Sequence, residues 1–102
     1  MEATVNDIVK IMDGIAPPNL AESWDNVGLL VGRNSNTVKK LMVALDVSPE
    51  VVEQAVEHKV QMLVTHHPVI FDPIKKMTDR SWQHKLLLDC AENKIAVYSA
   101  HT

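Results

Sequence analysis

Residues 62–68, MLVTHHP, decide the fold of this chain. Three apolar residues in a row are typical of a strand covered on both faces, as in a parallel sheet. Two adjacent histidines, His66 and His67, end this strand, and Pro68 stops it and keeps the backbone of His67 extended. Two polar rings at the end of a buried strand need several partners. We therefore expect His66 and His67 to be metal ligands at the mouth of an α/β sheet. The alternative is a histidine pair that bonds only buried backbone groups.

The segment before this strand predicts a βαβ unit. Residues 40–47, KLMVALDV, form an apolar run that we interpret as a second buried strand. Ser48, Pro49 and Glu50 then occupy the positions that an N-cap serine, a first-turn proline and an early acid prefer in a helix. A strand, a helix and the histidine strand at this spacing indicate parallel strands joined by a crossover.

The first segment of the chain predicts a helix, and the segment after it has two interpretations. Apolar residues recur at helical spacing over about residues 4–15, behind a capping box of Thr4 and Asp7. Residues 20–32, LAESWDNVGLLVG, then lead into a short apolar strand. We favour a turn in which Trp24 fills the core. The functional alternative places Glu22 or Asp25 against a site.

The last segment predicts a third helix and a third buried strand. Ser81 is expected to cap the helix, and residues 95–101, IAVYSAH, read as the strand. Four residues form the expected inward face of that helix: Trp82, Leu86, Leu87 and Cys90. We assign Cys90 to packing rather than to nucleophilic catalysis, because free cysteine is commonly a core residue.

Each of the three predicted strands ends in residues that can bind a metal ion. Asp46 ends the first, the histidine pair ends the second, and His101 ends the third. Ligands of open α/β sheets bind outside the carboxyl ends of the strands, so neighbouring strands would bring these four side chains together. Asp46 has the alternative role of ending its strand and starting the next helix. His101 has the alternative role of a surface residue.

The adjacency of His66 and His67 bears on the number of ions. Successive side chains on a strand point to opposite faces, so two neighbours cannot easily chelate one ion. Either the chain turns sharply at Pro68, or each imidazole serves its own ion of a pair roughly 3.5–4 Å apart. Imidazole with carboxylate favours Zn²⁺, Fe, Mn²⁺ or Co²⁺ over Ca²⁺. Such ions lower the pKa of bound water toward about 7, which suits hydrolysis near neutral pH.

Composition limits the classes of protein. With 102 residues, of which 46% are hydrophobic, the chain fits one domain. A net charge of −3 without any cluster of basic residues argues against nucleic acid as a partner. The single Cys90 excludes an internal disulfide. No apolar run approaches the roughly 20 residues that span a bilayer, and the first residues lack a signal peptide. We therefore expect a cytoplasmic protein that does not enter a membrane.

Three stretches together resemble a known family. Residues 21–32 (AESWDNVGLLVG), 64–71 (VTHHPVIF) and 98–102 (YSAHT) look like the NIF-three-like family, whose members are also called GTP cyclohydrolase 1 type 2 homologues. The resemblance implies an α/β fold whose two related halves enclose a dinuclear metal site, with His66 and His67 among its ligands. It also implies a homo-oligomer, commonly a hexameric ring.

The resemblance also shows where this chain departs from the family. The chain stops at Thr102, where the family motif continues to a metal-binding aspartate, and the family's second half supplies another histidine and a glutamate. We therefore expect residues 1–102 to be a single α/β domain, the N-terminal half or a fragment of a larger two-lobed protein. It would have a largely parallel sheet flanked by helices. Asp46 and His101 enter only as residues near the site, and we expect weak metal binding by this chain alone.

Two functions are consistent with the resemblance. The first is a hydrolase with two divalent ions per full-length subunit, acting on a purine nucleotide or a related substrate. The alternative is a non-catalytic ring that serves as a scaffold or binds regulators of transcription. Whether the protein is an enzyme, and which of the four metals it binds, stay open at this point.

Overall fold

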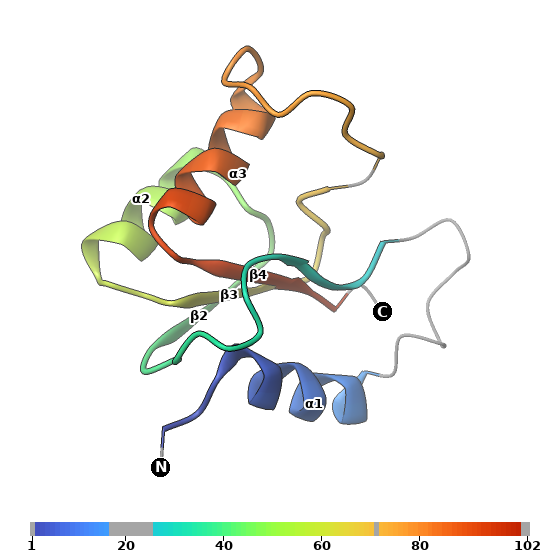
Figure 1. Cartoon of the computed structure of the whole chain (residues 1–102), viewed down its shortest axis with the longest axis vertical. Coiled ribbons are helices and arrows are strands. Elements are labelled where there is room, and N and C mark those ends of the chain that lie inside the picture. The colour runs from blue at the N-terminus through green and yellow to red at the C-terminus, as the bar shows by residue number, and fades with distance from the viewer. Residues whose placement is uncertain (1, 17–25, 71, 101–102) are drawn as a thin grey trace.

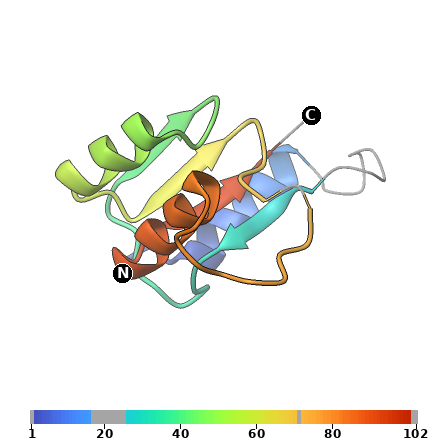
Figure 2. The same ribbon diagram turned by 90° about the horizontal axis from the view of Figure 1, so that it is seen from above.

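The structure is a computed structural model that describes residues 2–16, 26–70 and 72–100. Three helices flank one sheet in these residues (Figures 1 and 2). The elements in chain order are α1 (Val5–Ile15), β1 (Gly28–Val31), β2 (Leu41–Ala44), α2 (Pro49–Glu57), β3 (Met62–Thr65), α3 (Trp82–Glu92) and β4 (Ala96–Ser99). None of the described helices has both the length and the apolar composition that crossing a bilayer requires.

The sheet is largely parallel, as the sequence predicts. Its strand order is β1-β4-β3-β2. β3 runs parallel to β2 on one side and to β4 on the other, and only β1 pairs in the antiparallel sense. Figure 1 shows α1 on one face of the sheet and α2 and α3 on the other. The carboxyl ends of β2, β3 and β4 therefore lie along one edge of the sheet, where Asp46 follows β2 and His66 and His67 follow β3.

β3 and β4 are the buried centre of the sheet. All four residues of each strand are buried, which agrees with their unbroken apolar sequence. Their side chains alternate between two cores. Leu63 and Val97 pack with residues of α2 and α3, whereas Val64 and Tyr98 pack with residues of α1. The histidine strand is thus covered on both faces, as expected.

All three helices begin at the predicted caps. Thr4 and Asp7 form a capping box, in which Thr4 N–H donates to Asp7 Oδ2 at 2.9 Å and Asp7 N–H donates to Thr4 Oγ1 at 3.3 Å. Ser48 accepts from the backbone of its own helix, and Ser81 does the same in α3. Local sequence therefore determines where each helix starts.

Tyr98 links the buried sheet to the end of α1. Its hydroxyl donates to Asp13 Oδ1 at 2.5 Å. Burial, together with this bond and the charge of Asp13, raises the pKa of the Tyr98 hydroxyl. The ring fills the core beneath α1, while the bond satisfies its polar tip.

The sequence predicts a buried strand over residues 40–47, and the structure shows that one face of this segment is exposed instead. Only Leu41–Ala44 form β2, at the edge of the sheet, and Val43 is 74% exposed. Leu41 and Leu45 are also exposed. The reason is the position of α1, which packs on residues of β1, β3 and β4 and leaves this face of β2 uncovered.

The expected inward face of α3 is correct for three residues and wrong for one. Leu86, Leu87 and Cys90 are buried, whereas Trp82 is 58% exposed. Trp82 is the first residue of α3, and it lies beside His67 and Asp46 at the carboxyl edge of the sheet rather than over the core.

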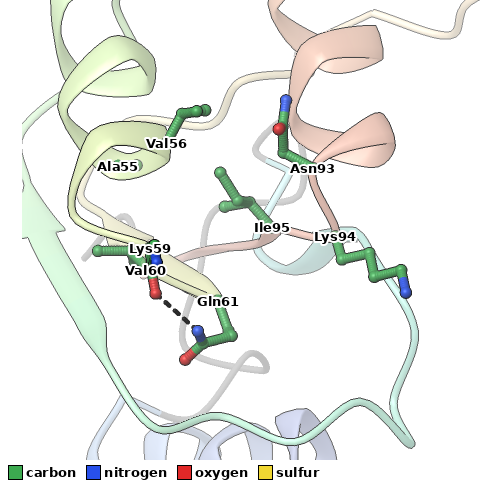
Figure 3. A pocket seen from close by; sticks show the side chains of 8 residues that line it. All are labelled: Ala55, Val56, Lys59, Val60, Gln61, Asn93, Lys94 and Ile95. Atoms are coloured by element: carbon green, nitrogen blue, oxygen red, sulfur yellow. Dashed lines mark hydrogen bonds between the residues drawn. The ribbon is translucent and has the colours of Figure 1, made fainter.

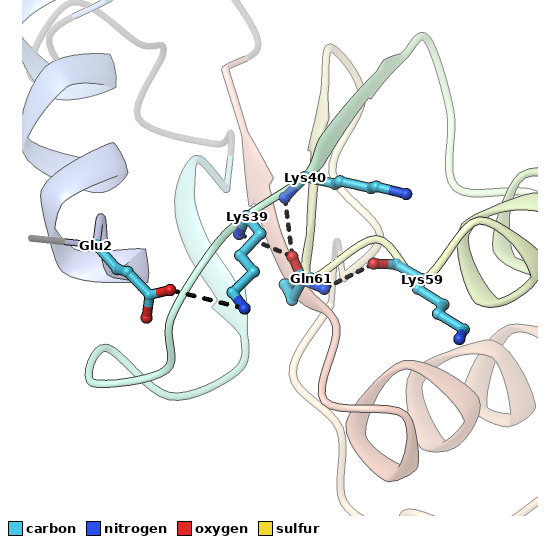
Figure 4. Close-up of polar contacts among 5 residues, drawn as sticks. All are labelled: Glu2, Lys39, Lys40, Lys59 and Gln61. Atoms are coloured by element: carbon cyan, nitrogen blue, oxygen red, sulfur yellow. Dashed lines mark hydrogen bonds and ion pairs between the residues drawn. The ribbon is translucent and has the colours of Figure 1, made fainter.

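Gln61 fixes the start of β3 against the start of β2 (Figure 4). Its Oε1 atom accepts from the backbone N–H groups of Lys39 and Lys40, both at 2.8 Å, and its Nε2 atom donates to the Lys59 carbonyl at 2.6 Å. This clamp holds the register in which Ala44 pairs with Thr65. The residues after both strands consequently emerge side by side.

The turns from α2 into β3 and from α3 into β4 have the same construction. Lys59 and Lys94 have left-handed backbones, with φ of 55° and 57°. Each turn is closed by a backbone bond that runs back into the helix: Val60 N–H to the Ala55 carbonyl at 2.9 Å, and Ile95 N–H to the Cys90 carbonyl at 2.8 Å. Both are Schellman motifs. They surround a hollow of about 300 Å³ at the amino end of the strands (Figure 3).

Candidate metal centre

His66 and His67 follow β3 directly and are held by its neighbour β2. His66 N–H donates to the Ala44 carbonyl at 3.3 Å, and His67 N–H donates to the Leu45 carbonyl at 3.0 Å. The buried Thr65 hydroxyl donates to the His67 carbonyl at 2.9 Å. The ladder thus continues for two residues beyond the strand, so the backbone of the pair is fixed.

β4 supports the pair from the other side. The hydroxyl of Ser99, which is fully buried, donates to the His66 carbonyl at 3.4 Å. Ala100 N–H donates to the Thr65 carbonyl at 2.9 Å. Both carbonyls of the histidine pair therefore accept bonds from hydroxyl side chains at the ends of β3 and β4.

The two imidazoles are close together but face different surroundings. Their ring centroids are 4.8 Å apart and their planes are tilted by 59°. His66 lines a hollow of about 470 Å³ with Val43, Leu45 and Val64, which we call the His66 hollow. His67 lines a second hollow of about 140 Å³, which we call the His67 hollow. The alternation of a regular strand thus persists into the pair.

Asp46 lies against His67, on the side of the sheet that carries α3. Its Oδ1 atom is 2.5 Å from Nδ1 of His67, and both residues line the His67 hollow. A carboxylate accepts the Nδ1 proton, so the opposite ring atom, Nε2, is the one that would bind an ion. Both side chains are about half exposed, at 46% for His67 and 56% for Asp46. The sequence placed Asp46 near the site, and the structure brings it into direct contact with one of the two expected ligands.

The imidazoles of His66 and His67 and the carboxylate of Asp46 are of the type that binds a transition metal, but they do not complete the coordination of an ion. Two imidazoles and one carboxylate match Zn²⁺, Fe, Mn²⁺ or Co²⁺. Among the residues that the structure describes, no group of three or more His, Cys, Asp or Glu side chains is placed to hold an ion. A structural zinc site uses four ligands. The described residues therefore fit the imidazole part of a metal site, and an ion here would take further ligands from elsewhere.

Four residues singled out in the sequence lie outside the described part of the chain. These are His101 and, in the segment before β1, Glu22, Trp24 and Asp25. A contact of Asn26, which the sequence predicts to bond local backbone groups in a turn, instead joins residues 44 positions apart. Asn26 Nδ2 donates to the Ile70 carbonyl at 2.7 Å, which ties the approach to β1 to the segment after the histidines.

The comparison with known proteins decides the family. A family model described as Duf34/NIF3 (NGG1p interacting factor 3) matches residues 3–102. The chain belongs to the Duf34/NIF3 family. The resemblance inferred from the three sequence stretches is thereby confirmed.

Relatives and solved structures within the Duf34/NIF3 family agree. The chain is 39% identical over 98 residues to a GTP cyclohydrolase 1 type 2 homolog of Clostridium perfringens, covering 96% of this chain and 37% of that protein. It is 36% identical over 96 residues to NIF3-like protein 1 of Drosophila melanogaster, covering 93% of this chain and 33% of that protein. The crystal structure of a Bacillus cereus protein related to NIF3 superposes with a TM-score of 0.91 at 31% identity, covering 98% of this chain and 28% of that one.

The chain corresponds to one part of these longer proteins. It spans between about a quarter and two fifths of the length of the curated Duf34/NIF3 relatives that it matches. The fold of the described residues is the α/β fold of this family. The activity, substrate and partners of a whole protein are matters for proposal.

Proposed function

We propose that the protein carrying this chain is a metal-dependent hydrolase in which His66 and His67 each bind one of two divalent ions. Its substrate is a purine nucleotide or a related compound. The observation that carries the proposal is the placement of the two rings at the carboxyl edge of the sheet, with a carboxylate already orienting one of them.

The ring geometry favours two ions over one. A single Zn²⁺ would require a nitrogen of each ring at about 2.0–2.1 Å from the same point. The rings instead line different hollows, which is what two ions, each bound by one ring, would require.

Each described residue has a separate task in this proposal. His66 and His67 bind, and the ladder to β2 together with the hydroxyls of Thr65 and Ser99 holds their backbone in place. Asp46 acts on His67, because its bond to Nδ1 sets the orientation of the ring. Ions bound there would supply a nucleophile near neutral pH and stabilise developing negative charge.

The name of the Clostridium perfringens relative, GTP cyclohydrolase 1 type 2 homolog, supports a purine nucleotide as the substrate class. The proposal includes a protein that is longer than this chain and supplies the remaining ligands from outside it. It also includes a cytoplasmic homo-oligomer, a hexameric ring by the family resemblance.

The test compares metal content and hydrolysis in two variants of the protein that carries this sequence. We expect the double substitution H66A/H67A to remove most of the metal found by elemental analysis and to reduce GTP hydrolysis to background, with the oligomer intact. The control is H58A, at the exposed C-cap of α2, which should keep the metal. A double variant with full metal content and normal turnover would refute the proposal.

A second candidate is a non-catalytic interaction protein. An exposed apolar surface, made of Leu41 and Val43 of β2 and of Leu45 directly after it, favours contact with another protein surface. The description of the matching family model includes the words NGG1p interacting factor 3. Partner capture that survives metal removal, with no metal-dependent turnover, would support this candidate over the hydrolase.

A further inference from the structure

An open hollow of about 830 Å³ lies next to the candidate metal centre. It is lined by the segment after the histidines and by the first turns of α3. It shares two lining residues, Val69 and Gln83, with the His67 hollow. The two hollows are therefore neighbours, with Val69 and Gln83 lying between them or beside both.

The lining of this larger hollow is basic, and we call it the basic hollow. Lys75, Lys76 and Arg80 line it, against one acid, Asp72. The chain as a whole has a net charge of −3, so this local excess of cations runs against its overall balance. In the part of the chain that the structure describes, none of the three cations takes part in an ion pair. Their charges are therefore not neutralised within the described fold.

The His66 hollow makes a useful contrast. Its lining is mainly apolar, with Val43, Leu45, Val64 and Ala100 around the ring, and it includes no Lys or Arg. The two imidazoles thus face chemically different spaces. An anionic ligand would be attracted to the side of His67, where the basic hollow adjoins it.

The size and chemistry of the basic hollow suit a phosphate-bearing molecule. Binding sites for small molecules typically enclose about 300–1,000 Å³. Arg and Lys are the side chains that proteins use most for phosphate, through charge-assisted hydrogen bonds. The three cations, rather than the start of α3, supply the attraction, because Ser81 already accepts from the His84 N–H in the first turn of that helix.

We propose that the basic hollow binds the phosphate-bearing part of the substrate through Lys75, Lys76 and Arg80, while the reacting end lies toward the neighbouring His67 hollow, where an ion held by His67 would act on it. The inference rests on the proposed function, which it deepens by assigning the substrate's anionic end to this chain's own residues. From the sequence alone, residues 71–76 are expected only to form a loop beyond the site.

The test measures GTP binding in the presence of a metal chelator, so that ions do not contribute. Calorimetry is carried out on the protein that carries this sequence, with GTP and with uncharged guanosine as probes. The variant K75Q/K76Q/R80Q should weaken GTP binding by roughly tenfold or more and leave guanosine binding unchanged, because only the charged contacts are lost. The matched control is K10Q/R33Q/K39Q, which removes two exposed lysines and one exposed arginine elsewhere and should bind GTP like the parent.

The outcomes separate this inference from the proposed function. GTP affinity that is equal in K75Q/K76Q/R80Q and the parent overturns the inference, as does an equal loss in the control triple variant. Elemental analysis of the same preparations, taken before the chelator is added, tests the metal site independently. A protein without metal whose GTP binding still depends on the three cations would refute the hydrolase and support the phosphate site. A metal-loaded protein whose GTP binding does not depend on the three cations would support the metal site and refute the phosphate site.

Discussion

The two ends of the central strands are held by different kinds of hydrogen bond. At the amino ends of β3 and β4, the turns bond to the helices that precede them, whereas at the carboxyl end of β3 the histidine pair bonds to residues of other elements. Val60 and Ile95 bond back to the helix that each has just left. His67 instead bonds to Asp46, which is 21 residues away, and the His66 carbonyl accepts from Ser99, which is 33 residues away.

The difference shows how one sheet separates stability from chemistry. The backbone groups of the amino-end turns are hydrogen-bonded locally. These turns therefore hold the strands independently of substitutions at the carboxyl edge. The carboxyl edge gathers titratable groups whose positions depend on strand register. Gln61 connects the two ends, because its clamp at the start of β3 fixes the register that brings Asp46 beside His67.

The largest effect is expected from breaking the amino end at Gly32. This residue follows β1 with φ of +121°, and an added Cβ would lie 2.7 Å from Ala96 Cβ and 2.8 Å from Ala96 Cα. Gly32→Ala should lower the free energy of unfolding by about 3 kcal/mol or more, through backbone strain and overlap with β4. Urea denaturation measures it. The control, Gly14→Ala, adds a Cβ with nothing within 4 Å in α1 and should stabilise by about 0.5–1 kcal/mol.

The second prediction breaks the carboxyl edge without disturbing the fold. Asp46→Asn removes the carboxylate from His67 Nδ1, so metal affinity should fall about 10–100-fold, as for other residues that orient a ligand. The change in unfolding free energy should stay within about 0.5 kcal/mol, because the side chain is half exposed. Competition with a chelator measures affinity, and Asp79→Asn, at an exposed position, is the control. Unchanged affinity would exclude this role of Asp46.

The third prediction concerns Cys90, whose carbonyl closes the turn into β4. Burial, and to a smaller extent the charge of Asp89, raises the pKa of the Cys90 thiol from 9.0 to about 11. The native state therefore keeps the thiol proton more tightly than the unfolded state does. This contribution to stability is complete below pH 9 and is lost as the pH rises from 9 to about 11, by roughly 2 kcal/mol.

Urea denaturation across that pH range measures the effect. Cys90→Ala should remove this part of the pH dependence while costing about 1–2 kcal/mol at neutral pH from lost packing. An identical alkaline loss in the parent and Cys90→Ala would show that other groups, such as Tyr98, are responsible.

The smallest effect sharpens the comparison at the two helix ends. Lys59 and Lys94 occupy left-handed positions that favour glycine. Lys94→Gly and Lys59→Gly should each stabilise the protein by about 0.5–1 kcal/mol, because glycine adopts this backbone without steric cost. Thermal denaturation measures the gain, and Lys94→Ala is the control, since it removes the side chain but keeps the strain. A gain from alanine as large as that from glycine would contradict the explanation.

The helix starts and the buried strands could be predicted because their signals are local. Ser48, Ser81 and Thr4 each cap a helix with groups only three residues away. The apolar runs of β3 and β4 required burial on both faces, which the structure provides. The histidine pair stood out for the same reason, because polar rings follow directly after a buried run.

The exposed face of β2, the outward position of Trp82 and the basic hollow could not be predicted in this way. An apolar edge strand has the same apolar sequence pattern as a central strand. Whether one face of β2 is exposed depends on where α1 packs. From the sequence, Lys75 and Lys76 belong to a predicted loop beyond the site and Arg80 has no assigned role, because the hollow forms only when this segment faces α3.

The sequence by itself determined the family, the helix caps, the largely parallel sheet and the histidine pair at its edge. Short-range hydrogen bonds and the burial of apolar runs are encoded in neighbouring residues, which is why they could be inferred from the sequence. Only the tertiary structure decided that His66 and His67 face different hollows and that Asp46 bonds to one ring. It also decided that a hollow lined by three cations neighbours the His67 hollow. Those relations join residues far apart in the chain, and they arise from strand order and helix packing.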